Sequence, residues 1–486
     1  MTRAALLLAL LLGPPPGAWA KDAGSGVFER ARRTPAFQLL EELVSRRHGK
    51  QEPEAGVPAT GALREEPAKP APAQEASRPG KVPPPSFSRL LPEVARALLE
   101  AIAPSAVAAD AGHAAEPAFE GRGVGTKGSR AYAEHLKERL ARAGLEVSEQ
   151  PFTVPPLTDF AFGGRRFEDL FRSADARNVI GRLEGSDPLL SEELVILTAH
   201  FDHLVPTRDF FHWAIVPALA LFLHPPGPIA GNGLPALLAQ FAIQSVLTRD
   251  FSLNVLTGRP FPLPGPRKIF PGADDNGSGT AGLLAIADAA GSLARRGVRP
   301  KRTILIAFLD AEEVGLKGAR RFVDGLSPEE RANIVQVINL DMIGWSPKNH
   351  PDRVHVLLPP TMPLLAQVLV SPVLPFREGP EFAQRHNPLL YRKIEELNAR
   401  IGSRLELRYT NHEFNGSDHY AFFMMERPDG LRTSVVMFYD GGEGPYHREG
   451  DQGATVDGDY AARVTRLAGA LAFDVADSEE LPRYEP

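Results

Sequence analysis

Three short, β-branched apolar runs constrain the fold of this 486-residue chain more than any other feature. Each has the pattern of a buried strand that ends in a polar residue, namely residues 193–200, 303–310 and 334–341. A fourth run of this kind covers residues 176–185, and helical patterns lie between the runs at residues 281–296 and 316–324. This alternation predicts an α/β fold with a mixed, mostly parallel sheet sandwiched by helices. In such sheets ligands bind beyond the carboxyl ends of the strands, where these polar residues are expected.

The N-terminal segment has the pattern of a signal peptide over residues 1–20. Arg3 precedes an apolar run at residues 4–12, and Ala18-Trp19-Ala20 supplies a small-x-small cleavage signal. As a helix the apolar run would span only about 14 Å, whereas a bilayer core is roughly 30 Å thick. The expectation is therefore export by a Sec-type signal, to the periplasm or the extracellular space.

Composition divides the rest of the chain. Residues 21–48 are predicted to form an amphipathic helical segment, and residues 49–85 a disordered linker rich in Pro, Ala and Glu. The main domain is then expected over residues 86–486, with a long insertion at residues 204–270. An apolar stretch at residues 210–224 of the insertion is short for a membrane span. A cap packed on the core is the preferred interpretation, and an interfacial membrane contact or a substrate lid would also fit the pattern.

Charge and cysteine content exclude several classes of protein. The net charge of −6 and the absence of a basic cluster argue against nucleic acid as a partner. The chain has no cysteine, so it can form no disulfide. Any metal ion must therefore be held by histidines and carboxylates.

Two polar segments follow the strands at residues 193–200 and 303–310. The strand period places His200 and Asp202 on one side, where Asp202 can orient the His200 ring. A histidine that only forms structural hydrogen bonds would give the same pattern. Glu312 and Glu313 follow the second strand, and they are either solvated charges or a base and a metal ligand crowded into a confined site.

Three more polar positions complete the pattern. Asp274 and Asp275 are adjacent acids in a Gly-rich turn before a helix, where a simple helix cap would also place an acid. Asp341 ends an apolar strand, where a carboxylate is costly unless it is paired or bound to metal. A Gly-rich loop near the C-terminus then carries a last group of polar residues: Tyr446, His447 and Asp451.

Taken in order, the motifs AHFD, GADDNGSG, DAEEVGLKGA, NLDMIG and PYH resemble those of the co-catalytic zinc aminopeptidases of peptidase family M28. The resemblance covers roughly residues 125–476 and implies the zinc-exopeptidase fold. The segment GSDHYAFF also resembles the family and would place Ser417, Asp418 and His419 near the site as supporting residues. The long connection between His200 and Asp275 departs from the compact family pattern and leaves the shape of the pocket open.

The resemblance implies a centre with two Zn²⁺ ions per chain. His200 and Asp341 would complete one zinc site, Glu313 and His447 the other, and Asp275 would bridge the two. A cis peptide bond would follow this aspartate, at Asp275-Asn276.

The remaining residues would act around the metals. Glu312 would stay off both ions, take a proton from the attacking water and pass it to the leaving amine. Tyr446 would hydrogen-bond the developing oxyanion. Asp202 and Asp451 would support the ligands.

The implied activity is removal of amino acids from peptide N-termini. Carboxypeptidase-like and amidohydrolase activities are compatible with the same centre. A glutaminyl-cyclase-like acyl transfer and a non-catalytic binding module of the same fold are the competing interpretations. Metal stoichiometry separates them, and the sequence indicates neither the preferred side chain nor the oligomeric state.

Overall fold

The computed structural model describes residues 90–155, 173–208, 267–359, 379–411 and 414–484. The predicted signal peptide, amphipathic segment and linker lie outside these residues, and so do residues 209–266 of the insertion. All described residues belong to one unit, Pro84–Pro486. None of the helices in the described ranges combines the length and the apolar character needed to cross a bilayer.

An eight-stranded mixed sheet forms the centre of the domain, in the order β1-β2-β6-β3-β7-β10-β8-β9. The pairings β6–β3, β3–β7, β7–β10 and β8–β9 are parallel, and the other three are antiparallel. All four strands predicted from apolar runs are present, and the predicted mixed, mostly parallel sheet is confirmed. The strands are β1 Glu146–Val154, β2 Ala174–Leu183, β3 Leu194–His200, β6 Thr303–Leu309, β7 Ile334–Leu340, β8 Arg353–Leu357, β9 Glu406–Thr410 and β10 Val435–Tyr439.

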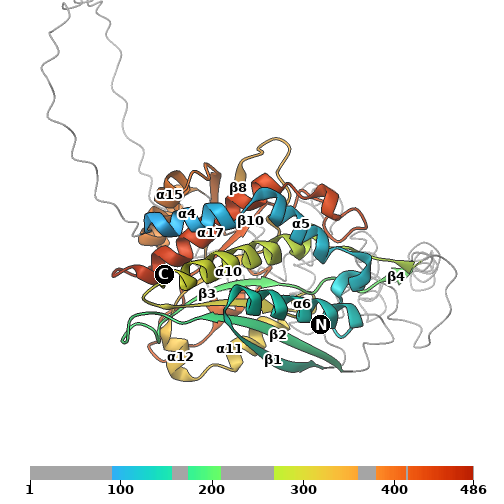
Figure 1. Cartoon of the computed structure of the whole chain (residues 1–486), viewed down its shortest axis with the longest axis horizontal. Coiled ribbons are helices and arrows are strands. Elements are labelled where there is room, and N and C mark those ends of the chain that lie inside the picture. The colour runs from blue at the N-terminus through green and yellow to red at the C-terminus, as the bar shows by residue number, and fades with distance from the viewer. Residues whose placement is uncertain (1–89, 156–172, 209–266, 360–378, 412–413, 485–486) are drawn as a thin grey trace, which may run out of the picture. The chain divides into compact units, whose positions relative to one another are not determined.

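The larger part of the core lies on the face of the sheet covered by α10 and α17 (Figure 1). Both helices are rich in Ala and Leu, and each buries most of its length against β3 and β7. Three N-terminal helices complete this layer because their apolar sides pack on α10. The helices of this face are α4 Pro92–Ala101, α5 Pro104–Ala114, α6 Lys127–Ala143, α10 Gly279–Arg295 and α17 Gly458–Asp477.

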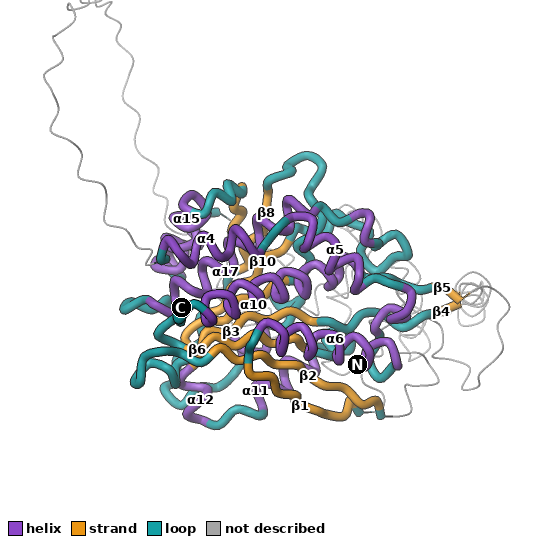
Figure 2. The backbone as a smooth tube through the Cα atoms, viewed as in Figure 1, coloured by secondary structure: helices purple, strands orange, loops and turns teal. Residues whose placement is uncertain are grey.

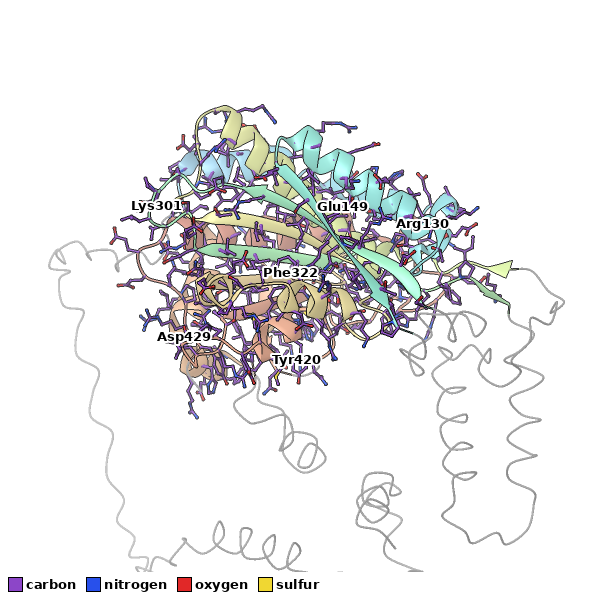
Figure 3. All side chains as sticks on the ribbon, turned by 90° about the horizontal axis from the view of Figure 1, so that it is seen from below. Arg130, Glu149, Lys301, Phe322, Tyr420 and Asp429 are labelled. Atoms are coloured by element: carbon purple, nitrogen blue, oxygen red, sulfur yellow. The ribbon has the colours of Figure 1, made fainter. Side chains whose placement is uncertain are left out.

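The opposite face carries α11 and α16, and Figure 3 views the molecule from this side, with Phe322 and Tyr420 labelled. Successive residues of β6 serve the two layers in turn: Phe308 packs toward α10 and Leu309 toward α11 and α16. The sheet is therefore buried on both faces, which explains its continuous apolar runs. The remaining helices are α11 Lys317–Asp324, α12 Pro328–Asn333, α14 Pro380–His386, α15 Pro388–Arg400 and α16 His419–Met424, with short turns η1 Pro117–Arg122, η3 Ala273–Ser278 and η4 Gly453–Thr455.

The two ends of the predicted insertion lie side by side. β4 Thr207–Arg208 and β5 Arg267–Lys268 pair as a short antiparallel ladder (Figure 2). The chain therefore leaves the domain and returns to it at the same place.

Parallel pairing of β3 with both β6 and β7 brings three strand ends to one edge of the sheet. His200 at the end of β3 is in register with Leu309 of β6, and Thr198 is in register with Asn339 of β7. The polar residues that follow these strands must therefore meet at this edge, as the strand pattern predicts.

Candidate metal centre

The first group of polar residues lies directly at the strand ends. Nε2 of His200 lies 3.2 Å from Oδ1 of Asp341, the first residue after β7. The same nitrogen lies 3.4 Å from Oδ1 of Asp275. All three side chains are buried. These residues, called the strand group below, are close enough together to hold one metal ion.

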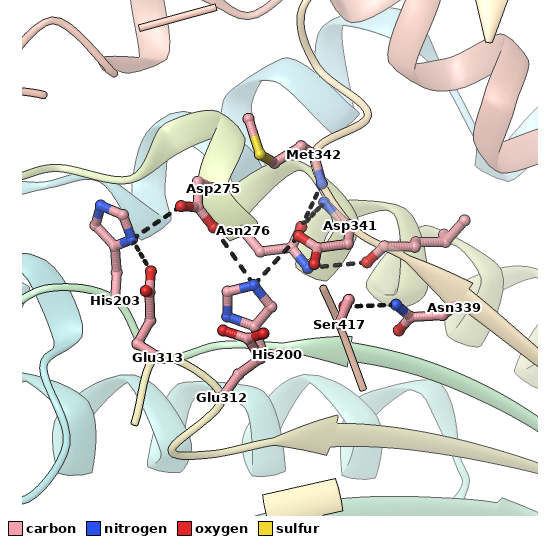
Figure 4. A network of polar contacts seen from close by, with 12 residues as sticks. His200, His203, Asp275, Asn276, Glu312, Glu313, Asn339, Asp341, Met342 and Ser417 are labelled. Atoms are coloured by element: carbon pink, nitrogen blue, oxygen red, sulfur yellow. Dashed lines mark hydrogen bonds and ion pairs between the residues drawn. The ribbon is translucent and has the colours of Figure 1, made fainter. Parts of the chain in front are cut away.

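A second group comes from loops and meets the first at Asp275. Nε2 of His447 lies 3.1 Å from Oδ2 of Asp275 and 3.1 Å from the Glu313 carboxylate. His203, which no motif identified, also belongs here, because its Nδ1 lies 2.8 Å from Oε1 of Glu313. His203, Asp275, Glu313 and His447 form the loop group, and their ligand atoms lie within 4.8 Å of one another. Asp275 thus belongs to both groups (Figure 4).

Asp275 is held in place by hydrogen bonds to the backbone of its own turn. The carboxylate of Asp451 accepts from the N–H groups of Asp274 and Asp275, at 2.8 and 3.0 Å. The side chain of Asn276 donates to the Leu340 carbonyl at 2.8 Å, which joins this turn to the end of β7. The Asp275–Asn276 peptide bond is cis, as the family resemblance implies.

The contacts of Asp202 differ from the predicted orientation of the His200 ring by the Asp202 side chain. Nδ1 of His200 contacts the backbone carbonyl oxygen of Asp202 at 3.1 Å, whereas the nearer carboxylate oxygen is 3.8 Å away. The carboxylate instead accepts from the backbone N–H groups of Glu312 and Glu313, at 2.9 and 3.3 Å. Asp202 therefore orients the His200 ring through its main chain and fixes the Glu312–Glu313 turn through its side chain.

A fully buried arginine joins the segments that carry the two groups. Arg122 donates through Nε to the Phe201 carbonyl at 2.8 Å, and through its other nitrogens to the carbonyls of Pro271 and Gly272, each at 2.8 Å. It also donates to Ala114. One guanidinium thus links the residue after His200 to the turn before Asp275.

Backbone conformations that are uncommon for L-residues occur at one candidate ligand and next to others. Ala311, Met342 and His447 have φ values of 60°, 52° and 53°. Ala311 precedes the two glutamates and Met342 follows Asp341. Left-handed non-glycine residues of this kind cluster at functional sites, where the surroundings over-determine the backbone.

Glu312 lies beside the His200 ring but belongs to neither group (Figure 4). Burial raises the pKa of its carboxyl well above the ordinary value, and Glu313, Asp418 and Asp341 raise it further, while His200 opposes them. Its position outside both groups leaves this carboxyl group available for proton transfer.

The site opens into a pocket of about 380 Å³. Its polar floor carries His200, Asp275 and Asp341, and Tyr446 lines the pocket with 46% of its surface exposed. The Tyr446 ring stacks on His447, with centroids 3.8 Å apart. The predicted catalytic and ligand residues therefore all line one pocket or border it.

The supporting segment at residues 417–419 lies behind the strand group. Ser417 accepts a hydrogen bond from Asn339 of β7 at 2.8 Å (Figure 4). Asp418 is fully buried and its carboxylate has no hydrogen-bond partner among the described residues. Burial raises the pKa of Asp418 to about 7, against the positive charge of His200.

The histidine and carboxylate side chains of the two groups are suited to binding a metal cation. Burial opposes ionisation of Asp275, but His203, His200 and His447 outweigh it and hold its pKa well below the ordinary value. For Glu313, burial is likewise outweighed, chiefly by His447, and the pKa falls to about 2. Within the described ranges, the ion-pair partners of Asp275, Glu313 and Asp341 are histidines alone. Buried carboxylates without Lys or Arg need another positive charge, and imidazole with carboxylate is a normal ligand set for zinc.

The buried histidine and carboxylate side chains at the carboxyl edge of this α/β sheet form a candidate metal centre. Residues 257–472 match the model described as "Peptidase family M28". The resemblance predicted from the motifs is thereby confirmed over these residues.

Similar proteins include an aminopeptidase of Pseudomonas aeruginosa, 42% identical over 74 residues, which covers 15% of this chain and 13% of that protein. The "Probable glutamate carboxypeptidase" of Arthroderma benhamiae is 39% identical over 74 residues, covering 15% of this chain and 10% of that protein. The chain thus spans well under a fifth of the length of these curated relatives. The crystal structure of the Legionella pneumophila LapA aminopeptidase aligns with a TM-score of 0.49 and 16% identity, covering 82% of this chain and 79% of that one.

Proposed function

We propose that this protein is a zinc-dependent exopeptidase that removes amino acids from the N-termini of peptides. The observation that carries the proposal is the position of Asp275, which is shared by two buried groups at the floor of one pocket, with Glu312 beside them. The family match and the aminopeptidases among the relatives support the same activity.

Two zinc ions per chain would occupy the centre. His200 and Asp341 would hold one ion, Glu313 and His447 the other, and Asp275 would bridge them, since each group offers at least three ligand atoms. Bound zinc would act as a Lewis acid toward the scissile carbonyl and lower the pKa of the attacking water.

Glu312 would transfer the proton during hydrolysis. The water oxygen forms a bond to the carbonyl carbon, and Glu312 takes a proton from that water. The C–N bond then breaks, and Glu312 gives the proton to the leaving amine. The position of Glu312 beside the His200 ring and outside both groups of ligands supports this role.

Tyr446 would assist at the rim of the pocket. Its ring stacks on His447, and the partly exposed side chain lines the pocket. The phenol would donate a hydrogen bond to the oxygen that becomes negative as the carbonyl is attacked.

The pocket walls favour an apolar side chain on the first residue of the substrate. Beyond the polar floor the lining includes Met342, Leu357 and Met437, with Tyr439 beside them. A charged side chain here would lose hydration without gaining a partner among these residues. We therefore propose peptides that begin with Leu, Met or Phe as the preferred substrates.

A direct test combines zinc analysis with a substrate panel. Wild type is expected to hold two zinc ions and to hydrolyse Leu-p-nitroanilide but not its N-acetylated form. Glu312→Gln keeps the size of the side chain, and should lower kcat by about 10²–10⁴-fold with zinc content unchanged.

The competing functions give different results in the same experiment. One zinc with cyclisation of an N-terminal Gln peptide indicates the acyl-transfer enzyme. Hydrolysis of an N-blocked substrate at its C-terminus indicates a carboxypeptidase. Zinc without any turnover, or no zinc, indicates a binding module and contradicts the proposal.

Export to the periplasm or the extracellular space remains part of the proposal. It is supported by Arg3, the apolar run at residues 4–12 and the cleavage signal at Ala18-Trp19-Ala20. N-terminal sequencing of the protein recovered outside the cytoplasm should give Lys21 as the first residue. An intact Met1 in that fraction would contradict cleavage at this site.

A further inference from the structure

His203 is the one member of the two metal-binding groups that the family motifs leave without a role. It lies three residues beyond His200 and is fully buried. Its Nδ1 lies 2.8 Å from Oε1 of Glu313 and 3.5 Å from Oδ2 of Asp275. The ring therefore points at the same carboxylates as His447 does.

The spacing of these atoms matches a ligand shell. Four tetrahedral ligands at about 2.0–2.1 Å from zinc lie roughly 3.3 Å from one another. The separations are 3.1 Å for His447 to Asp275 and to Glu313, and 2.8 and 3.5 Å for His203 to Glu313 and to Asp275. All four atoms can surround a single ion with small movements.

The ring of His203 is also held in this orientation by packing. A Cβ placed on Gly272 would lie 2.6 Å from Cδ2 of the ring, so the imidazole packs directly on this glycine. Its other neighbour is the His447 ring, which meets it edge-on with centroids 5.4 Å apart. A ligand fixed in advance loses little conformational entropy when the ion binds.

We propose that His203 is a fourth protein ligand of the zinc site formed with Asp275, Glu313 and His447. This inference rests on the two-zinc centre of the proposed function. It makes the two sites unequal, because the loop group supplies four protein ligands and the strand group three. Four-ligand sites are closed and retain their metal, whereas three-ligand sites keep a position for water or substrate. The loop site then binds zinc more tightly, and the strand site is the open one.

A hydrogen-bonding role for His203 is the competing account. In that role Nδ1–H would donate to Glu313 and hold the carboxylate in place, as outer partners of metal ligands do. Nε2 of His203 has no hydrogen-bond partner within the described residues. This holds in either role, so the atom does not distinguish the ligand role from the hydrogen-bonding role. The two roles predict different zinc retention when a side chain with a neutral N–H donor replaces His203.

Zinc retention against a chelator measures the difference without any assay of activity. The full chain is loaded with zinc, equilibrated with increasing EDTA, and its zinc content is determined. Wild type should release one zinc early and hold the second to EDTA concentrations at least ~100-fold higher. His203→Ala should lose that second, resistant zinc, with a shift larger than the ~10–100-fold typical of outer partners.

Two further variants sharpen the outcome. His203→Asn keeps an N–H group near the position of Nδ1 but is a poor zinc ligand, so it should behave like His203→Ala. His386→Asn, at another buried histidine in α14, is the matched control and should retain zinc as wild type does. Wild-type retention in His203→Asn or in His203→Ala overturns the proposal.

X-ray absorption on wild type loaded with one zinc keeps the test independent of how the variants fold. Two imidazole ligands on that zinc are expected, and a single imidazole overturns the inference. Wild type that binds no zinc at all contradicts the proposed function itself. Wild type that binds two zincs while His203 has no effect contradicts only the role of His203.

Discussion

The strand group and the loop group reach the same carboxylate by different routes. His200 and Asp341 stand at the ends of two paired strands, so the sheet itself sets their separation. Glu313, His447 and His203 lie in loops, and their positions depend on hydrogen bonds such as those from the Glu312 and Glu313 backbone to Asp202. Ligands of the first group are placed by the fold, whereas those of the second are placed by a supporting polar network.

Removing the residue common to both groups should give the largest effect. Asp275→Asn keeps the shape of the side chain but replaces the shared carboxylate with a neutral amide, a poor zinc ligand. Both zinc ions should be lost together, and kcat/KM should fall by more than about 10³-fold. Elemental analysis and kinetics on one sample check this. Retention of one full zinc in the variant would show that the two groups are independent.

Breaking the link between the groups should cost stability without removing a ligand. Arg122→Met leaves several buried carbonyl groups without their donor, at Phe201, Pro271 and Gly272. The expected loss in the free energy of unfolding is about 3–5 kcal/mol, because each buried acceptor left without its donor costs about 1–3 kcal/mol. Urea unfolding of the metal-free protein measures it. A loss below about 1 kcal/mol would mean that Arg122 does not hold the two segments together.

Loosening only the loop group should give a smaller and selective effect. In Asp202→Asn, a single amide oxygen must replace two carboxylate oxygens that accept from the Glu312 and Glu313 backbone. The affinity of the loop site for zinc should fall by about 10–100-fold, with the strand site less affected. Chelator titration separates the two ions. Equal weakening of both sites would contradict the division between strand-held and loop-held ligands.

The smallest predicted effect concerns the carboxylate behind the strand group, and it depends on pH. Asp418 has no hydrogen-bond partner in the described part of the chain, and burial raises its pKa to about 7 from 3.8. The folded protein binds this proton more tightly than the unfolded chain does. The contribution of Asp418 to the free energy of unfolding is therefore fully present below about pH 4 and is lost as the pH rises toward 7.

Asp418→Asn removes this dependence. The variant should gain stability relative to wild type between pH 5 and pH 7, by on the order of 2 kcal/mol, in the metal-free protein. Urea unfolding at the two pH values provides the measurement. A gain of the same size at both pH values would mean that Asp418 does not titrate in this range.

Much of the fold was predictable because buried strands carry their own signal. The apolar runs of β2, β3, β6 and β7 are continuous, since helices cover both faces of the sheet. His200 and Asp341 were predictable for the same reason, as polar residues at the ends of such runs. Asp275, Glu313 and His447 needed the family motifs, because loop residues have no period from which their direction can be inferred.

Several features leave no signal in the sequence. His203 lies beyond the end of β3, where the alternation of strand side chains no longer applies. Arg122 acts on carbonyl groups of residues 201, 271 and 272, and a contact of this kind leaves no pattern in the chain. The backbone contact between Asp202 and His200 was missed because the strand period describes side chains only. The insertion at residues 204–270 is described only at its two ends, so its predicted role as a cap stays a prediction.

Anomalous diffraction at the zinc edge, from a crystal of the zinc-loaded protein, tests the two-site centre most directly. Two peaks about 3.5–4 Å apart are expected, with the Asp275 carboxylate between them. One peak should lie within ligand distance of His200 and Asp341, and the other within ligand distance of His203, Glu313 and His447. A single peak, or two peaks that do not share Asp275, would contradict the account.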